Sequence, residues 1–152
     1  MSSKDFVVVC DNIRSRENVG SIFRTADALG VTKIYLCGIT PQPPHEKIAK
    51  TALGAEKSVP FEYHKQTLRL VKKLKSKKVF VTVLEQSKTS IVYTKLKPKF
   101  PLALVIGNEV TGVSKNVVKI ADKAMYLPMG GKKESLNVAV AFGVAGYFIK
   151  QL

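Results

Sequence analysis

The chain has 152 residues, the size of one ordinary domain, and carries 25 basic residues against 11 acidic ones, a net charge of +14. A domain of this size buries roughly 70% of the surface of its unfolded chain, so disulfide bonds are not needed to hold it together. No apolar stretch reaches the ~20 residues of a membrane span. Residues 1–5 lack the basic region and apolar block of a signal peptide, so we expect a cytoplasmic protein that is not inserted in a membrane.

The first 38 residues predict a strand, a helix and a second strand. The apolar run 6–10 indicates a buried strand, the apolar residues of 20–29 have helical spacing, and 33–37 forms another apolar run. Gly30 and Gly38 end the helix and the second strand. Short connections make this a βαβ unit, which implies parallel strands.

The rest of the chain continues this alternation. In order, we expect a proline-rich loop at 40–44, a short helix at 45–53, an edge strand at 58–63, a helix at 65–74, strands at 79–84 and 102–106, a helix at 114–120, a short strand at 124–127 and a last helix at 135–149. The fold class is therefore α/β, with one mostly parallel sheet between helices. Ligands bind beyond the carboxyl ends of such strands, so the loops after residues 84, 106 and 127 form the expected site.

The two cysteines, Cys10 and Cys37, lie in or beside the first two strands. Free cysteine behaves as a small buried apolar residue. We therefore expect two reduced core thiols rather than a disulfide.

The excess of positive charge favours a polyanionic partner. Nucleic acid is the first candidate and an acidic membrane surface the second, while a purely solubilising surface is the alternative. Residues 65–78 hold seven basic residues and no acidic one, as either a solvated face or an RNA contact. Arg14, Arg16 and Arg24 surround the entry to the first helix, where backbone N–H groups favour anions, and are a sharper candidate for phosphate binding.

Two loops are rich in glycine. Residues 107–114 have the glycine spacing of a P-loop, but Val113 replaces its lysine and Glu109 would repel a triphosphate, so we exclude nucleotide hydrolysis. In residues 128–137, two adjacent glycines let a ligand approach the backbone. We expect Ser135 to cap the last helix. This second loop indicates a small-molecule pocket.

Three motifs together resemble the TrmH-like (SpoU) branch of the SPOUT RNA methyltransferases. They are NIRSRENVGSIFRTA at 12–26, LVIGNEVTGVS at 104–114, and LPM at 127–129 with SLNVA at 135–139, in the order and spacing of that family. The resemblance implies a single SPOUT domain over residues 1–152. It also implies a C-terminal deep trefoil knot, with a knotted cofactor-binding part at about 79–152, and no separate RNA-binding domain.

The resemblance further implies methyl transfer from S-adenosylmethionine to a ribose 2′-hydroxyl of tRNA or rRNA. It implies RNA rather than DNA as the partner and no metal. The cofactor contacts that it implies are Leu84, Ile106, Gly107, Leu127, Met129 and Leu136. A non-catalytic RNA-binding module that keeps the fold is the alternative function.

A homodimer through the knotted region and the last helix also follows from the resemblance. That helix is apolar nearly all round. Its large apolar residues are Val138, Val140, Phe142, Val144, Tyr147 and Phe148. A central core helix, which needs no partner chain, is the alternative.

Arg24 matches the key arginine of the family. Because a guanidinium stays protonated, we expect Arg24 to grip the adjacent phosphate and stabilise the developing alkoxide rather than act as a base. The alternative is a surface ion pair with Asp27.

Four further residues are expected in the catalytic group. Asn18 would order the first loop and orient the substrate, Glu109 would orient Arg24 or pair across the dimer, and Ser135 and Asn137 would position the ribose or the arginine. For Asn18 and Ser135, a purely capping role is the alternative. The expected RNA contacts are Arg14, Arg16 and Lys132.

Overall fold

Seven parallel strands form one sheet, in the order β3-β2-β1-β6-β4-β7-β5, in the computed structural model, which describes residues 1–151. The strands are β1 (Phe6–Asp11), β2 (Lys33–Cys37), β3 (Phe61–His64), β4 (Phe80–Leu84), β5 (Ile91–Val92), β6 (Leu102–Gly107) and β7 (Lys123–Tyr126). The helices are α1 (Arg16–Leu29), α2 (Glu46–Ala52), α3 (Ala55–Ser58), α4 (Thr67–Ser76), α5 (Lys115–Ile120) and α6 (Val138–Lys150). The predicted α/β class with a parallel sheet is confirmed; the knot stays a prediction.

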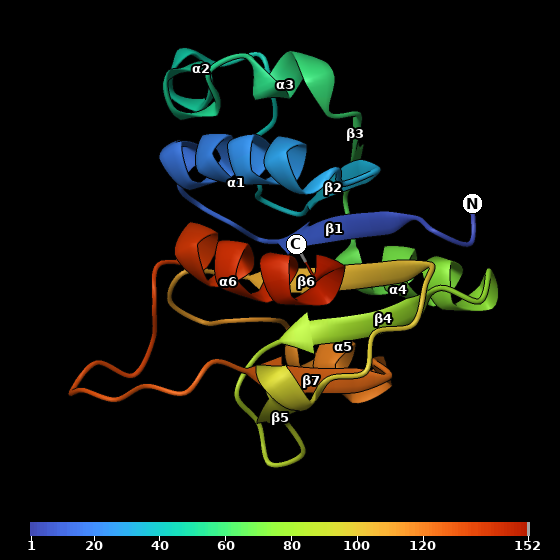
Figure 1. Ribbon diagram of the computed structural model, residues 1–152. Helices are drawn as coiled ribbons and strands as arrows, with labels where there is room; N and C mark the ends of the chain where they lie inside the picture. Colours follow the sequence, from blue (N-terminus) through green and yellow to red (C-terminus); the bar gives the residue numbers. More distant parts are fainter. Residues whose placement is uncertain (152) are drawn as a thin grey trace.

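Separate apolar cores cover the two faces of the sheet. In Figure 1, α1 and α6 lie in front of the sheet and α4 and α5 behind it. Side chains alternate along β1, so Phe6 and Val8 join the core under α1 and α6, while Val7 and Val9 join the core under α4 and α5. All of β1 is buried, as is typical of a strand covered on both faces. None of the helices within residues 1–151 is long and apolar enough to cross a membrane.

The ends of two helices differ from the prediction. Helix α1 begins at Arg16, four residues early, because Ser15 Oγ accepts the N–H of Asn18 at 3.1 Å and caps the helix there. Helix α6 begins at Val138, and its cap is Asn137. The prediction that Ser135 caps the last helix is therefore wrong. Serine and asparagine cap about equally well, so local preference could not choose between them.

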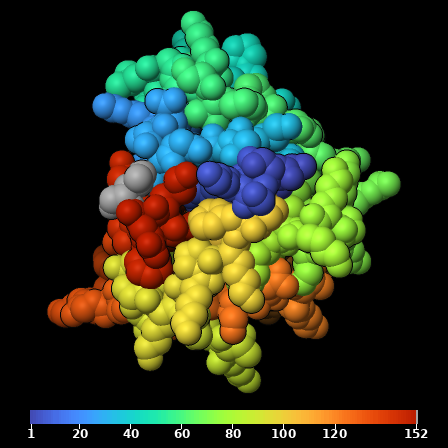
Figure 2. All heavy atoms as spheres, turned by 45° about the vertical axis from the view of Figure 1, so that its right-hand side comes forward, coloured from blue at the N-terminus to red at the C-terminus, as the bar shows by residue number. Residues whose placement is uncertain are grey.

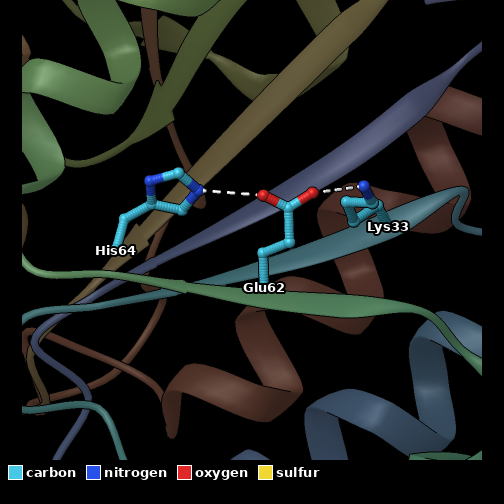
Figure 3. Close-up of polar contacts among 3 residues, drawn as sticks. All are labelled: Lys33, Glu62 and His64. Carbon is cyan, nitrogen blue, oxygen red and sulfur yellow. Dashed lines mark hydrogen bonds and ion pairs between the residues drawn. The ribbon is translucent and has the colours of Figure 1, made fainter.

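Both edges of the sheet carry very short strands. The edge strand predicted at 58–63 is shorter in the structure: Ser58 ends the short helix α3, and β3 has only four residues. Its Glu62 Oε1 pairs with His64 Nε2 at 3.2 Å, and Oε2 pairs with Lys33 Nζ of β2 (Figure 3). The hydrogen bond from Lys33 holds the pKa of Glu62 below its usual value. Short, charged edges of this kind discourage pairing with another chain. The opposite edge, β5, was not predicted.

The two cysteines are both free and buried, as predicted. Burial raises the pKa of Cys37 to about 12. Because the thiolate is the reactive form, this residue is an inert part of the core.

A buried carboxylate, Asp11, ends β1 and fixes the starts of two helices. Its Oδ1 accepts a hydrogen bond from Thr67 Oγ1 at 2.5 Å, at the first residue of α4. Its Oδ2 accepts both the N–H and the Oγ of Ser114, each at 2.7 Å, directly before α5. Asp11 is only 1% exposed, so water does not substitute for these partners. The carboxyl end of β1 thus positions both helices of the rear face.

We expect Asp11→Ala to lower the free energy of unfolding by about 2–4 kcal/mol, because three hydrogen-bond donors lose a charged acceptor inside the protein. Denaturation by urea would measure the change. Asp27→Ala removes an exposed carboxylate of α1 and is the matched control, expected within about 0.5 kcal/mol of the wild type. Equal losses from the two variants would contradict the role of Asp11.

Candidate functional site

An open cavity of about 240 Å³ lies at the carboxyl ends of β4, β6 and β7. The loops that follow these three strands line it, which is where open parallel sheets bind ligands. One wall comes from the 127–137 segment, which extends from the sheet on the left of Figure 1. The cavity lining includes all six residues predicted as cofactor contacts, namely Leu84, Ile106, Gly107, Leu127, Met129 and Leu136.

A tight backbone turn directly after β6 lines part of the cavity. The N–H of Asn108 donates to the carbonyl of Gly112 at 3.1 Å, and the N–H of Gly112 donates back to Asn108 at 2.9 Å. A Cβ at Gly107 would lie 2.3 Å from the backbone N of Val113, so only glycine allows this close approach. The segment with P-loop spacing is therefore a closed turn, and its residues line the cavity.

Glu109 joins this turn to the first loop of the chain. Its Oε1 accepts the N–H of Arg14 at 2.9 Å, and its Oε2 accepts the N–H of Ser15 at 2.9 Å and Nδ2 of Asn18 at 3.0 Å. Partial burial acts to raise the pKa of Glu109, but these hydrogen bonds outweigh it, so the pKa lies below its usual value. Within residues 1–151 of one chain, the Glu109 carboxylate is thus bound by the first loop and makes no ion pair with Arg24; its expected role toward Arg24 or across a dimer stays a prediction.

Asn18 extends the connection to the last helix. Its Oδ1 accepts a hydrogen bond from Nδ2 of Asn137 at 3.0 Å. Asn137 Oδ1 in turn accepts the N–H groups of Ala139 and Val140, which caps α6. Three of the five predicted catalytic residues, Glu109, Asn18 and Asn137, therefore form one chain of side chains beside the cavity. We call it the amide–carboxylate chain.

The other two predicted catalytic residues lie apart from this chain. Ser135 lines the cavity on the exposed 127–137 segment. Arg24 is exposed on α1 and borders a different hollow, formed with α2 and α3. Within residues 1–151, no ion pair joins Arg24 to Asp27. The structure therefore does not bring Arg24 to the cavity of its own chain.

The residues predicted to contact RNA are all exposed. Arg14 and Arg16 flank Ser15, whose backbone Glu109 holds, so they lie at the rim of the site. Lys132 is on the 127–137 segment. Their side chains are available to a ligand that covers the cavity.

Glu85 lines the cavity and was missed by the sequence-based reasoning. Its Oε2 accepts the N–H of Val113 at 2.7 Å, which ties the loop after β4 to the turn after β6. Gly112 has φ +73°, and a Cβ there would lie 1.9 Å from Oε2. Burial raises the pKa of Glu85 above its usual value. An acidic residue directly after a buried strand was the signal that could have identified it.

Comparison with known proteins gives a consistent result. The sequence profile of the SpoU rRNA Methylase family matches residues 5–147. The chain is similar to a tRNA (guanosine(18)-2′-O)-methyltransferase of Aquifex aeolicus, with 34% identity over 95% of the chain and 68% of the relative. It is also similar to the 23S rRNA (guanosine(2553)-2′-O)-methyltransferase RlmP of Bacillus subtilis, with 30% identity over 95% of the chain and 57% of the relative. The chain thus spans only part of each relative's length.

Solved structures have the same fold. The TrmH/SpoU tRNA modifying enzyme of A. aeolicus superposes with a TM-score of 0.87 and 32% identity, covering 97% of this chain and 75% of that one. An AdoMet-bound rRNA methyltransferase from Sinorhizobium meliloti superposes with a TM-score of 0.92 and 27% identity, covering 99% and 57%.

The lowered pKa of Glu109 predicts how Glu109→Gln changes stability with pH. The folded pKa lies below the ordinary value of 4.5, so ionised Glu109 stabilises the folded protein fully above that value. This contribution is lost as pH falls through the folded pKa. The variant lacks it at every pH, so the wild type should exceed it in free energy of unfolding near neutral pH, and the gap should shrink in acid.

Urea denaturation between about pH 3 and pH 7 would measure the gap. Hydrogen exchange at the amides of Arg14 and Ser15 should also be faster in the variant, which distinguishes a local effect from a global one. A gap that stays constant over this range would count against the proposed electrostatic origin.

Proposed function

The chain belongs to the SpoU rRNA methylase family, and from this membership we propose that it is an S-adenosylmethionine-dependent RNA methyltransferase. The reaction is transfer of a methyl group to a ribose 2′-hydroxyl of tRNA or rRNA. The names of the two relatives support this reaction, and the AdoMet-bound neighbour supports the cofactor. The observation that carries the proposal is the amide–carboxylate chain, which holds the first loop and the start of α6 beside a cavity at the strand ends.

The character of the cavity fits this cofactor. S-adenosylmethionine supplies an activated methyl group when bound. Apolar side chains from three loops can enclose its adenosyl part, and backbone groups around Gly107 can bind its polar edges. We propose that the six lining residues Leu84, Ile106, Gly107, Leu127, Met129 and Leu136 hold it.

The protein residues mainly position the RNA. A direct displacement needs the ribose oxygen aligned with the methyl carbon, so the rim of the cavity must be rigid. Asn18, Glu109 and Asn137 supply this rigidity, and Ser135 offers a hydroxyl to the ribose. Arg24, which stays protonated, grips the phosphate beside the reacting nucleotide and stabilises the developing alkoxide.

We propose a homodimer through the exposed side of α6. Val140, Val144 and Tyr147 are 53%, 40% and 43% exposed and follow helical spacing along one side. The opposite side packs into the core through Phe142 and Ile149. An exposed apolar stripe on a helix is typical of an association surface, and a two-fold dimer is the commonest symmetry. Because α1 packs beside α6, Arg24 of one protomer can then serve the cavity of its partner.

We expect the purified chain to bind S-adenosylmethionine and S-adenosylhomocysteine, but not ATP, in calorimetry. Arg24→Ala should keep this affinity and lower the rate of methyl transfer to RNA by about 100-fold or more, because one electrostatic stabiliser of the transition state is removed. Lys57→Ala on the neighbouring helix α3 removes the same charge and should keep the rate. Absence of cofactor binding would overturn the proposed function, and full turnover by Arg24→Ala would overturn only the role of that residue.

The dimer can be tested by placing a charge in the stripe. We expect Val144→Glu to shift sedimentation from dimer to monomer, because each protomer would bury an unpaired charge in the interface. Leu53→Glu makes the same change at a side chain that is 64% exposed on another surface, and should leave the dimer intact. A monomeric wild type, or a dimeric Val144→Glu, would contradict this interface.

A further inference from the structure

The exposed sides of α4 and α5 are almost purely basic. In α4 the exposed residues are Arg69, Lys72, Lys73 and Ser76, and in α5 they are Lys115, Asn116 and Lys119. Exposed Lys77 and Lys78 follow directly after α4, and exposed Lys123 is the first residue of β7, which follows α5. We define the basic face by its eight cationic residues: Arg69, Lys72, Lys73, Lys77, Lys78, Lys115, Lys119 and Lys123.

These residues form one surface because the two helices are tied side by side. Lys75 Nζ donates to the carbonyl of Ile120 and pairs with Asp122 at 3.2 Å, which joins α4 to the end of α5. In Figure 2 the lime residues of α4 and the orange residues of α5 lie next to each other on the right flank. The positive charges of both helices therefore add.

Nothing acidic in this region compensates the basic face. Asp122 is occupied by Lys75 and by the N–H of Val81 at 2.8 Å. Glu62, on the neighbouring edge strand, is occupied by Lys33 and His64 (Figure 3). Over residues 1–151, none of the ion pairs includes a member of the basic face. Unpaired cations gathered in this way gain from a polyanion by releasing its counterions.

The absence of apolar anchors identifies the kind of partner. The large apolar side chains exposed within residues 1–151 are Met1, Ile39, Leu53, Tyr63, Phe100, Val110, Leu136, Val140, Val144 and Tyr147, none of which lies on α4 or α5. Helices that lie on membranes insert large apolar residues, and protein interfaces use aromatic anchors. A charged face without either fits a sugar-phosphate backbone, which basic side chains bind through charge and through hydrogen bonds to the phosphate oxygens.

The basic face also begins at the carboxyl ends of the strands, which is the same end of the sheet as the cavity. Asp11 fixes the first turns of α4 and α5 at the carboxyl end of β1. From there α4 runs about 15 Å across the rear of the sheet, at 1.5 Å per residue. We propose that the basic face binds the backbone of the RNA substrate beyond the reacting nucleotide. This inference rests on the proposed function, since it presumes an RNA substrate at the cavity.

The test compares two variants of equal net charge. The first changes Arg69, Lys72, Lys73 and Lys119 to glutamine. The control changes four exposed lysines elsewhere, Lys4, Lys57, Lys95 and Lys97, to glutamine. For each variant, the affinity for unmodified tRNA would be measured over a range of salt concentrations. The affinity for S-adenosylmethionine and the rate of methyl transfer to tRNA and to a short RNA oligonucleotide would also be measured.

We expect the first variant to bind tRNA at least about 10-fold more weakly at low salt. The slope of log K against log salt should become less steep by about 3, because each of the four lost phosphate contacts contributes about 0.7–0.9. The control should change affinity less than about threefold, with a slope within about one of the wild type. Cofactor affinity and the rate on the short oligonucleotide should not change in either variant.

Three outcomes would overturn the proposal. One is an equal loss of tRNA affinity in both variants, which would mean that overall charge rather than this face binds RNA. Another is that the wild type methylates tRNA and the first variant has the same KM for tRNA and the same salt slope as the wild type. The third is a first variant that no longer binds phosphatidylserine vesicles, although the wild type does, and that still binds tRNA like the wild type. This result would make a membrane the partner. A wild type that binds no S-adenosylmethionine would instead contradict the proposed function.

Discussion

The candidate site depends on the carboxylate of Glu109. This side chain comes from the turn after β6 and accepts two backbone N–H groups of the first loop, 94 and 95 residues away in the sequence. Its third bond, to Asn18, continues to Asn137 across another 119 residues. Segments from the beginning, the middle and the end of the chain are therefore held together at the carboxyl ends of the strands. Because the donors include backbone groups, the carboxylate fixes the path of the loop rather than one side chain.

The fold class and the location of the cavity could be predicted, because the rule that ligands bind beyond parallel strand ends needs only the strand positions. The contacts inside the site could not. Ser135 and Asn137 are both good helix caps two residues apart, and the structure uses Asn137, which also bonds to the distant Asn18. Glu109 seemed suited to Arg24 by charge, yet two of its three partners are backbone N–H groups, which every residue but proline has and no motif reveals.

The two faces of the sheet have opposite surface chemistry. Helix α6 presents apolar side chains on one side of the molecule, while α4 and α5 present cations on the other. The buried strand β1 supports both, because alternate residues belong to the two cores. The proposed association between protomers and the proposed binding of an RNA backbone therefore use separate surfaces. A substitution on one face can alter its interaction while the other face and the cavity between the strand ends are retained.

The position of β1 between β2 and β6 also bears on how the chain folds. Phe6 pairs with Leu102, so one side of the first strand has no partner until most of the chain has been made. During synthesis, β1 and β2 can pair early, but an apolar strand edge stays open meanwhile. Closing it requires contacts of high sequence separation, which form slowly and leave a growing chain prone to aggregation. The arrangement that assembles the site from distant segments therefore makes completion of the sheet a late event in folding.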